Sequence, residues 1–112
     1  MTTIIHKRGD TLELTFQLKV DGVAQNITGY SFSSQLRDST DALLVTDNFD
    51  GNLTYTLINA LEGQFSFTAS PTETSEWDTR TYDCDLQITE PDSDVSSSET
   101  FKIKVIKDVT RA

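Results

Sequence analysis

The chain has 112 residues, of which 36% are hydrophobic and 24% are charged, and its formal net charge is −9. This length suits one domain with one core, and the acidic balance disfavours binding to the phosphates of nucleic acids. No apolar run approaches the roughly 20 residues of a membrane helix, and Met1 to Arg8 lack the apolar stretch of a signal peptide. One cysteine and one histidine supply neither an internal disulfide nor a structural zinc site. We therefore expect a single domain over residues 1–112, with no cofactor, no nucleic-acid partner and no membrane partner.

The clearest pattern in the chain is a strict alternation of apolar and polar residues from Leu12 to Val20. Such alternation predicts a β-strand that is buried on one face. The strand should end at Asp21-Gly22, because this dipeptide accepts the positive φ angles of a tight hairpin turn. We expect a short return strand through Val23 to Ile27.

Similar alternating or apolar segments recur along the rest of the chain, separated by turn residues. They predict further strands within 30–36, 43–49, 53–57, 65–69, 82–88 and 101–105. The segment from Pro71 to Glu76 is the one stretch with helical-turn character, because Ser or Thr ahead of Glu caps exposed backbone N–H groups. The pattern indicates an all-β fold, and about seven to eight antiparallel strands at this spacing are typical of an immunoglobulin-like sandwich or a small barrel, of which we expect the sandwich.

Three residues near the strand at 82–88 are predicted to be structural. Tyr82 stands two residues before Cys84 at the start of a strand, which is the arrangement of the tyrosine corner in immunoglobulin domains. Trp77 is large enough to fill one end of a sandwich. Cys84 lies on the inward parity of its strand, which favours a small core residue over a nucleophile.

Other short motifs allow a functional interpretation, but local structure explains them better. Arg8-Gly9-Asp10 matches an integrin-binding tripeptide, yet its position between two strands favours a turn or bulge. Carboxylates at 90, 92 and 94, or at 47 and 50, offer oxygen ligands for calcium, although β-turn chemistry accounts for both groups. His6 has no recognisable catalytic neighbours in sequence, and we expect no enzymatic activity.

Several of these motifs occur together in a fixed order. Lys7 to Thr11 leads into the first alternating strand, Asn26 to Tyr30 follows the hairpin turn, Thr74 to Trp77 precedes Tyr82 to Leu86, and Asp108 to Arg111 closes the chain. This order resembles the small immunoglobulin-like β-sandwich domains of tailed-bacteriophage structural proteins, such as the N-terminal domain of baseplate upper proteins and related prophage-encoded virion components.

The resemblance implies a phage or prophage virion structural protein, a tail, baseplate or decoration component that acts through protein–protein contacts. It implies oligomers of the chain itself and contacts with other virion proteins, in the virion and, during assembly, in the bacterial cytoplasm. The lysines at 102, 104 and 107 would either blunt a sheet edge or pair with the acidic surface of a neighbouring copy. The alternative is a carbohydrate-binding or other adhesive module, in which Trp77, Tyr30 or Tyr55 stacks on a sugar ring.

Overall fold

The computed structural model describes residues 2–98 and 100–109, and strands make up most of its regular structure. The elements in chain order are β1 (Thr3–Lys7), β2 (Leu12–Gln17), β3 (Lys19–Val20), β4 (Val23–Ala24), β5 (Ser31–Arg37), β6 (Thr54–Asn59), β7 (Gln64–Ala69), α1 (Pro71–Thr74), β8 (Thr81–Thr89), β9 (Val95–Ser97) and β10 (Phe101–Ile106). No helix among the described residues has the length and apolar character needed to cross a membrane.

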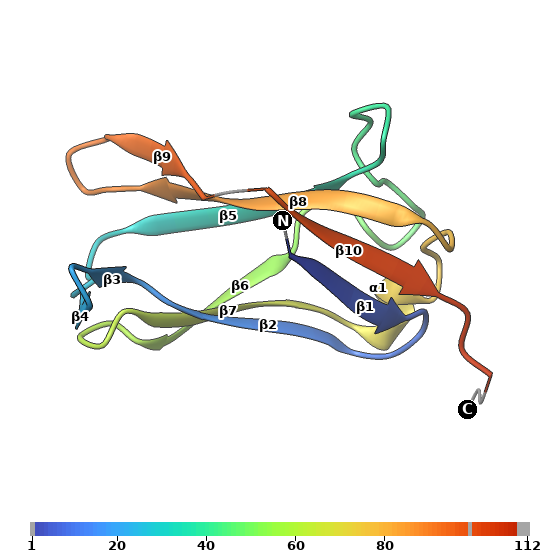
Figure 1. Cartoon of the computed structure of the whole chain (residues 1–112), viewed down its shortest axis with the longest axis horizontal. Coiled ribbons are helices and arrows are strands. Elements are labelled where there is room, and N and C mark those ends of the chain that lie inside the picture. Colours follow the sequence, from blue (N-terminus) through green and yellow to red (C-terminus); the bar gives the residue numbers. More distant parts are fainter. Residues whose placement is uncertain (1, 99, 110–112) are drawn as a thin grey trace.

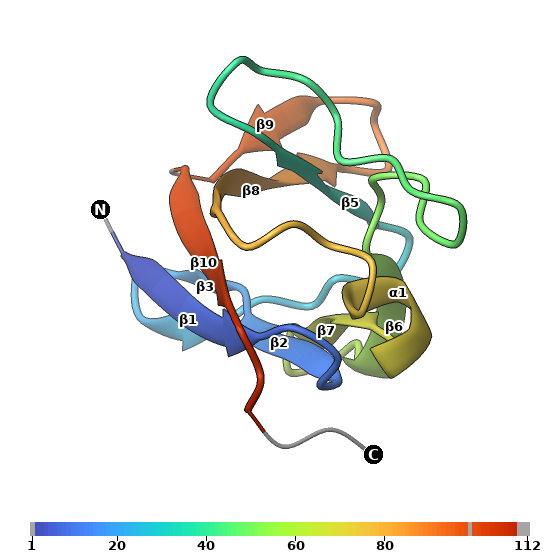
Figure 2. The same cartoon turned by 90° about the vertical axis from the view of Figure 1, so that its right-hand side faces the viewer.

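The strands form two facing layers (Figure 1). One sheet has the order β1-β10-β8-β5, with β9 paired to the far end of β8, and the other has the order β2-β7-β6. All strand pairs are antiparallel except β1 with β10, which run parallel. Figure 2 views the layers end-on, with β6 at the outer side of its sheet. This arrangement confirms the predicted all-β, immunoglobulin-like sandwich, but the described residues form ten strands instead of seven or eight, and the β1–β10 pair is parallel instead of antiparallel.

The core lies between the sheets and is built by the alternation that the sequence showed. Leu12 and Leu14 of β2 are buried, whereas Glu13 between them and Thr15 after them are exposed. Phe65 and Phe67 of β7, and the inward residues of β5, β8 and β10, complete the same cluster. A period of two places every second side chain on the inner face, so the repeated pattern alone positions the sheets.

The predicted hairpin turn after Lys19–Val20 is confirmed. Asp21 and Gly22 both have positive φ angles, 52° and 79°, and β3 pairs with β4 across them. This combination of angles is the one that two-residue hairpins require. The hairpin lies at the same end of the molecule as the β6–β7 turn (Figure 1).

The prediction of a strand at 43–49 is wrong. This segment forms isolated bridges, Arg37 with Leu43 and Thr46 with Phe49, instead of a continuous strand. The Glu76 carboxylate accepts hydrogen bonds from the backbone N–H and the side-chain amide of Asn48, at 3.0 and 2.8 Å, and so fixes this stretch as a loop. Its apolar residue Phe49 is buried as an anchor for the loop, which explains why the segment looked like a strand.

Candidate functional site

Trp77 is fully buried just after α1. Its ring centroid lies 5.0 Å from that of Phe49 and 6.2 Å from that of His6. The indole Nε1 is buried and has no hydrogen-bond partner among the described residues. Packing therefore holds the ring, and no face of it is available to stack on a sugar.

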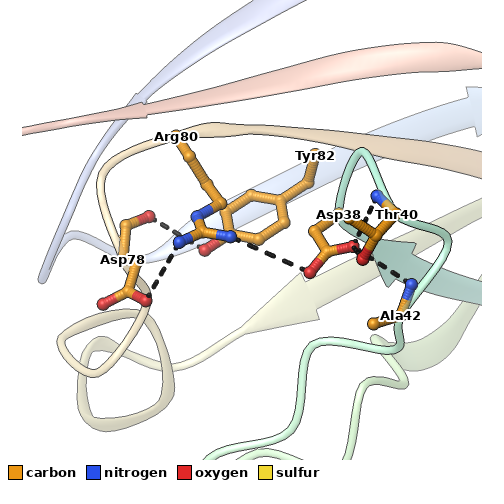
Figure 3. A network of polar contacts seen from close by, with 6 residues as sticks. All are labelled: Asp38, Thr40, Ala42, Asp78, Arg80 and Tyr82. Carbon is orange, nitrogen blue, oxygen red and sulfur yellow. Dashed lines mark hydrogen bonds and ion pairs between the residues drawn. The ribbon is translucent and has the colours of Figure 1, made fainter.

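Tyr82 forms a tyrosine corner at the start of β8. Its side chain is buried, and its hydroxyl donates a hydrogen bond of 2.9 Å to the backbone carbonyl of Asp78, four residues upstream. Burial raises the pKa of this phenol, so the hydroxyl keeps its proton and remains a donor. Figure 3 shows the ring beneath Arg80, whose guanidinium reaches the carboxylates of Asp78 at 3.6 Å and Asp38 at 3.8 Å.

Asp38 links the loop after β5 to this corner (Figure 3). Its carboxylate accepts hydrogen bonds from the hydroxyl and N–H of Thr40, at 2.6 and 2.8 Å, and from the N–H of Ala42 at 3.1 Å. The Thr40 hydroxyl is the main reason that the pKa of Asp38 is lowered. Half of the Arg80 side chain is exposed and both ion pairs are long, so they contribute little to stability, and the network orders a loop and shows no catalytic arrangement.

Cys84 is buried in β8, where its sulfur lies 3.1 Å from the Ser34 hydroxyl. Burial raises the pKa of the thiol to about 11. At neutral pH very little of the reactive thiolate is present, and the side chain is out of reach of a reagent. We expect a disulfide reagent to label the native protein slowly and the urea-unfolded protein fast. Equal rates in the two states would contradict the buried position.

The Arg8-Gly9-Asp10 segment is a turn held against α1, as the sequence analysis favoured. The Gly9 N–H donates to the Thr74 hydroxyl at 3.0 Å, and that hydroxyl donates to the Asp10 carbonyl at 2.8 Å. Thr74 is fully buried, so the turn is fixed from beneath by a residue far away in sequence. A tripeptide held in this way is not presented on a mobile loop.

His6 is buried in β1, where its Nε2 lies 3.1 Å from the Asp10 carbonyl oxygen and donates to it. Desolvation lowers the pKa of the imidazole below 6.5, against smaller opposing effects of Asp10. The unfolded chain therefore takes up this proton first, and the free energy of unfolding should fall as pH drops below 6.5, with the loss complete below the folded-state pKa. In urea titrations across this window, His6→Gln should remove the slope. An unchanged slope in that variant would contradict the assignment to His6.

The two acidic groups considered for calcium fall in turns. Glu90, Asp92 and Asp94 lie at the β8–β9 turn with ligand oxygens within 4.8 Å of one another. Asp92 accepts from the N–H of Asp94 at 3.1 Å, and Asp50 of the second group accepts from the N–H of Asn52 at 3.0 Å. These short-range bonds are ordinary turn chemistry.

The two tyrosines considered for sugar stacking are half-buried. The ring of Tyr30 stacks on Phe32, and its hydroxyl donates to Glu90 at 3.3 Å. The ring of Tyr55 lies 5.5 to 6.0 Å from those of Phe32, Phe65 and Phe67, centroid to centroid. Both rings are thus engaged by the aromatic core.

Among the described residues, the two main sheets leave five edge strands, because the short β9 adds an edge beside the far end of β8, and four of these edges are charged, short or partly covered. Residues 43–53 cover the second half of β5, for example through the hydrogen bond from Leu53 N–H to Ser34 carbonyl at 2.9 Å. The β1 edge carries the exposed Lys7 and lies beside Lys104 of β10. The β2 edge carries the exposed Glu13, and β9 is only three residues long. Charged, short or covered edges resist pairing with another strand.

The fifth edge strand, β6, is six residues long, carries no charge and exposes apolar side chains. Its sequence from Thr54 to Asn59 contains no ionisable group except the tyrosine. Leu57 and Ile58 are 50% and 53% exposed, and Leu61 in the following turn is 70% exposed. We define the β6 edge as residues 54–61. The sequence analysis predicted a strand at 53–57 but did not identify it as an edge, because the absence of charge between Asp50 and Glu62 does not by itself show where a sheet ends.

The backbone N–H and C=O groups of every second β6 residue point outward, on the side of the strand that faces away from β7. The position of the hydrogen bonds between β2 and β7 is fixed by the bond from the Leu18 N–H to the Gly63 carbonyl, so the odd-numbered residues of β7 bond to β2 and the even-numbered ones bond to β6. Because hydrogen bonds alternate along antiparallel strands, Thr54 and Thr56 must bond to β7, and the N–H and C=O groups of Tyr55 and Leu57 must face outward. No described residue pairs with β6 on that side. A β-bulge between Leu57 and Asn59 ends the regular stretch.

Comparisons with known proteins bear on the fold. No family model matches the chain, and no curated protein matches it. Among solved structures the chain is similar to CopC from Methylosinus trichosporium OB3b, with a TM-score of 0.50 and 12% sequence identity over 98% of this chain and 91% of that chain. At this identity the likeness supports the β-sandwich fold and carries no residue-level function.

The comparison corrects the function that the sequence led us to expect. A phage or prophage virion structural protein, with a carbohydrate-binding module as the alternative, was expected, but the fold is shared along almost the whole chain with CopC from Methylosinus trichosporium OB3b, and none of these comparisons points to a phage protein. The expectation is wrong because its motifs serve the sandwich itself. The Gly-Asp turn is held by Thr74, and the Tyr82 corner closes onto Asp78.

Proposed function

We propose that this chain is a non-enzymatic protein-interaction domain that binds an extended polypeptide segment along the β6 edge. The observation that carries the proposal is the pair of outward-facing backbone positions, Tyr55 and Leu57, in an edge strand without charge. Natural sheets blunt free edges with charges, short strands or covering segments, and each of the other four edges is charged, short or partly covered, β9 having only three residues. An added strand would satisfy these backbone groups, which is the chemistry of β-augmentation.

The side chains around these positions indicate an uncharged partner segment with alternating apolar residues. The Tyr55 side chain lies on the same inner face of β6 as the buried Leu53. Neighbouring aromatic rings hold its ring in place, so it presents a rigid apolar surface. Leu57 has the same parity, but half of its surface remains exposed. An apolar side chain of an added strand would cover that surface, whereas a charged one would lose its hydration.

His6 and Cys84 support the non-enzymatic part of the proposal. The imidazole is engaged with the Asp10 carbonyl beside Trp77, and the thiol is buried with a raised pKa. Both are therefore occupied in folding rather than placed as a base or nucleophile.

A synthetic peptide with the sequence of residues 53–60 is a suitable probe, because it carries the same uncharged alternation. We expect saturable binding by fluorescence anisotropy, and we expect Leu57→Lys to weaken it by at least about tenfold, the equivalent of 1.4 kcal/mol. The matched control is Ile5→Lys, since Ile5 is 66% exposed on the opposite sheet. Equal affinity in both variants, or no binding to the parent protein, would refute the proposal.

A further inference from the structure

We infer that the segment bound by the β6 edge is the β6 edge of a second copy, paired antiparallel about a two-fold axis at Thr56. This inference rests on the proposed function and names its partner. The symmetry follows from the phase of the free backbone groups. With Thr56 opposite its own copy, Tyr55 of one chain stands opposite Leu57 of the other, and both residues present free N–H and C=O groups. Each such opposed pair exchanges two hydrogen bonds, so the interface gains them symmetrically.

The side chains are compatible with this register. Tyr55 and Leu57 share the inner face, so the half-exposed Leu57 of each copy would lie beside the fixed Tyr55 ring of the other. Thr54 and Thr56 share the outer face and are exposed, and a cross-strand threonine pair is favourable there. No side chain in this register carries a charge or must be buried unpaired.

The distribution of charge favours a second copy at this edge over its other surfaces. Each chain carries a net charge of −9, so two copies repel each other at long range. The β6 edge brings together residues with no formal charge, and salt screens the remaining repulsion. Association through β6 should therefore strengthen as salt is added. Docking of the lysines near β1 and β10 onto an acidic surface, the other mode of self-association, should weaken with salt.

A cysteine cross-link tests the register. Residues opposite each other at a non-hydrogen-bonded position have Cα atoms about 4.5 Å apart, within the range of a disulfide, so Thr56→Cys should form a cross-linked dimer under mild oxidation. The matched control is Thr54→Cys, which is equally exposed on the same face. In the proposed register its two copies lie about four residues apart, roughly 13 Å, and should not cross-link. The native Cys84 is buried with a pKa of about 11 and should not compete.

We expect Thr56→Cys to form a reducible dimer and Thr54→Cys to form at least tenfold less of it. In sedimentation experiments, the parent protein should shift from monomer toward dimer as the protein concentration or the salt concentration rises. Leu57→Lys should abolish that shift. Equal cross-linking of the two cysteine variants, or a parent protein that stays monomeric at all concentrations, would overturn the inference. If the parent is monomeric yet still binds the 53–60 peptide, the proposed function survives and self-pairing alone fails. Circular dichroism of each variant confirms folding, which the exposed positions should permit.

Discussion

Replacing Trp77 by alanine should lower the free energy of unfolding by about 3–5 kcal/mol, the range for removing a large buried aromatic side chain. The loss has two physical sources. The ring is fully buried, so its transfer free energy is lost, and the cavity left between Phe49 and His6 cannot be filled by rigid neighbours. Phe49 would lose its ring contact with Trp77, so the loop at 43–53 should loosen as well.

Urea denaturation followed by circular dichroism measures this effect. Ile5→Ala is the matched control, because Ile5 is 66% exposed and its truncation should change stability by less than about 0.5 kcal/mol. Since small domains have total stabilities of about 5–15 kcal/mol, Trp77→Ala can approach complete unfolding, and Trp77→Phe then gives a smaller, measurable loss. A Trp77→Ala protein within 1 kcal/mol of the parent would contradict the role of Trp77 in closing the core.

Replacing Gly63 by alanine should be destabilising by about 1–3 kcal/mol or more, because strain and a steric clash act together. Gly63 has a φ angle of +67°, and a Cβ there would lie 2.6 Å from the carbonyl oxygen of Gln25 and 2.7 Å from that of Leu18. Both oxygens belong to the backbone, so neither can move without disturbing the contact between the β6–β7 turn and the β3–β4 hairpin.

Gly22→Ala separates the two contributions to this loss. Gly22 has a similar φ angle of +79°, but an added Cβ would meet no atom within 4 Å. This variant should therefore show the conformational strain without the clash. Thermal or urea unfolding should rank Gly63→Ala clearly below Gly22→Ala, and equal losses would show that the close approach at Gly63 is not limiting.

Most of the fold could be predicted because its strands are buried on one face only. In β2 and β8 the apolar residues at every second position determine which side chains enter the core, and Asp21-Gly22 has the chemistry of its turn. The Tyr82 corner was predictable for the same reason, since its hydroxyl bonds to a carbonyl only four residues away. Local patterns encode local geometry.

The features that could not be predicted depend on contacts between distant residues. The segment around Phe49 has the composition of a strand, but Glu76 holds Asn48 in a loop from 28 residues away in sequence. Likewise, no residue pattern near Leu57 indicates that the sheet ends at β6, because a strand is an edge when no other strand pairs with its outer side. The same limit applies to the functional resemblance, whose motifs are turns and corners that a sandwich needs for folding.

Hydrogen exchange at the amides of Tyr55 and Leu57 tests the proposed binding edge most directly. Both N–H groups face outward in the isolated chain, so they should exchange quickly, and saturation with the 53–60 peptide should slow them by at least about tenfold, as new hydrogen bonds protect them. The amides of Glu13, Thr15 and Gln17, which face outward from the β2 edge by the same alternation, should not change. Protection at β2 instead of β6, or at neither edge, would contradict the account.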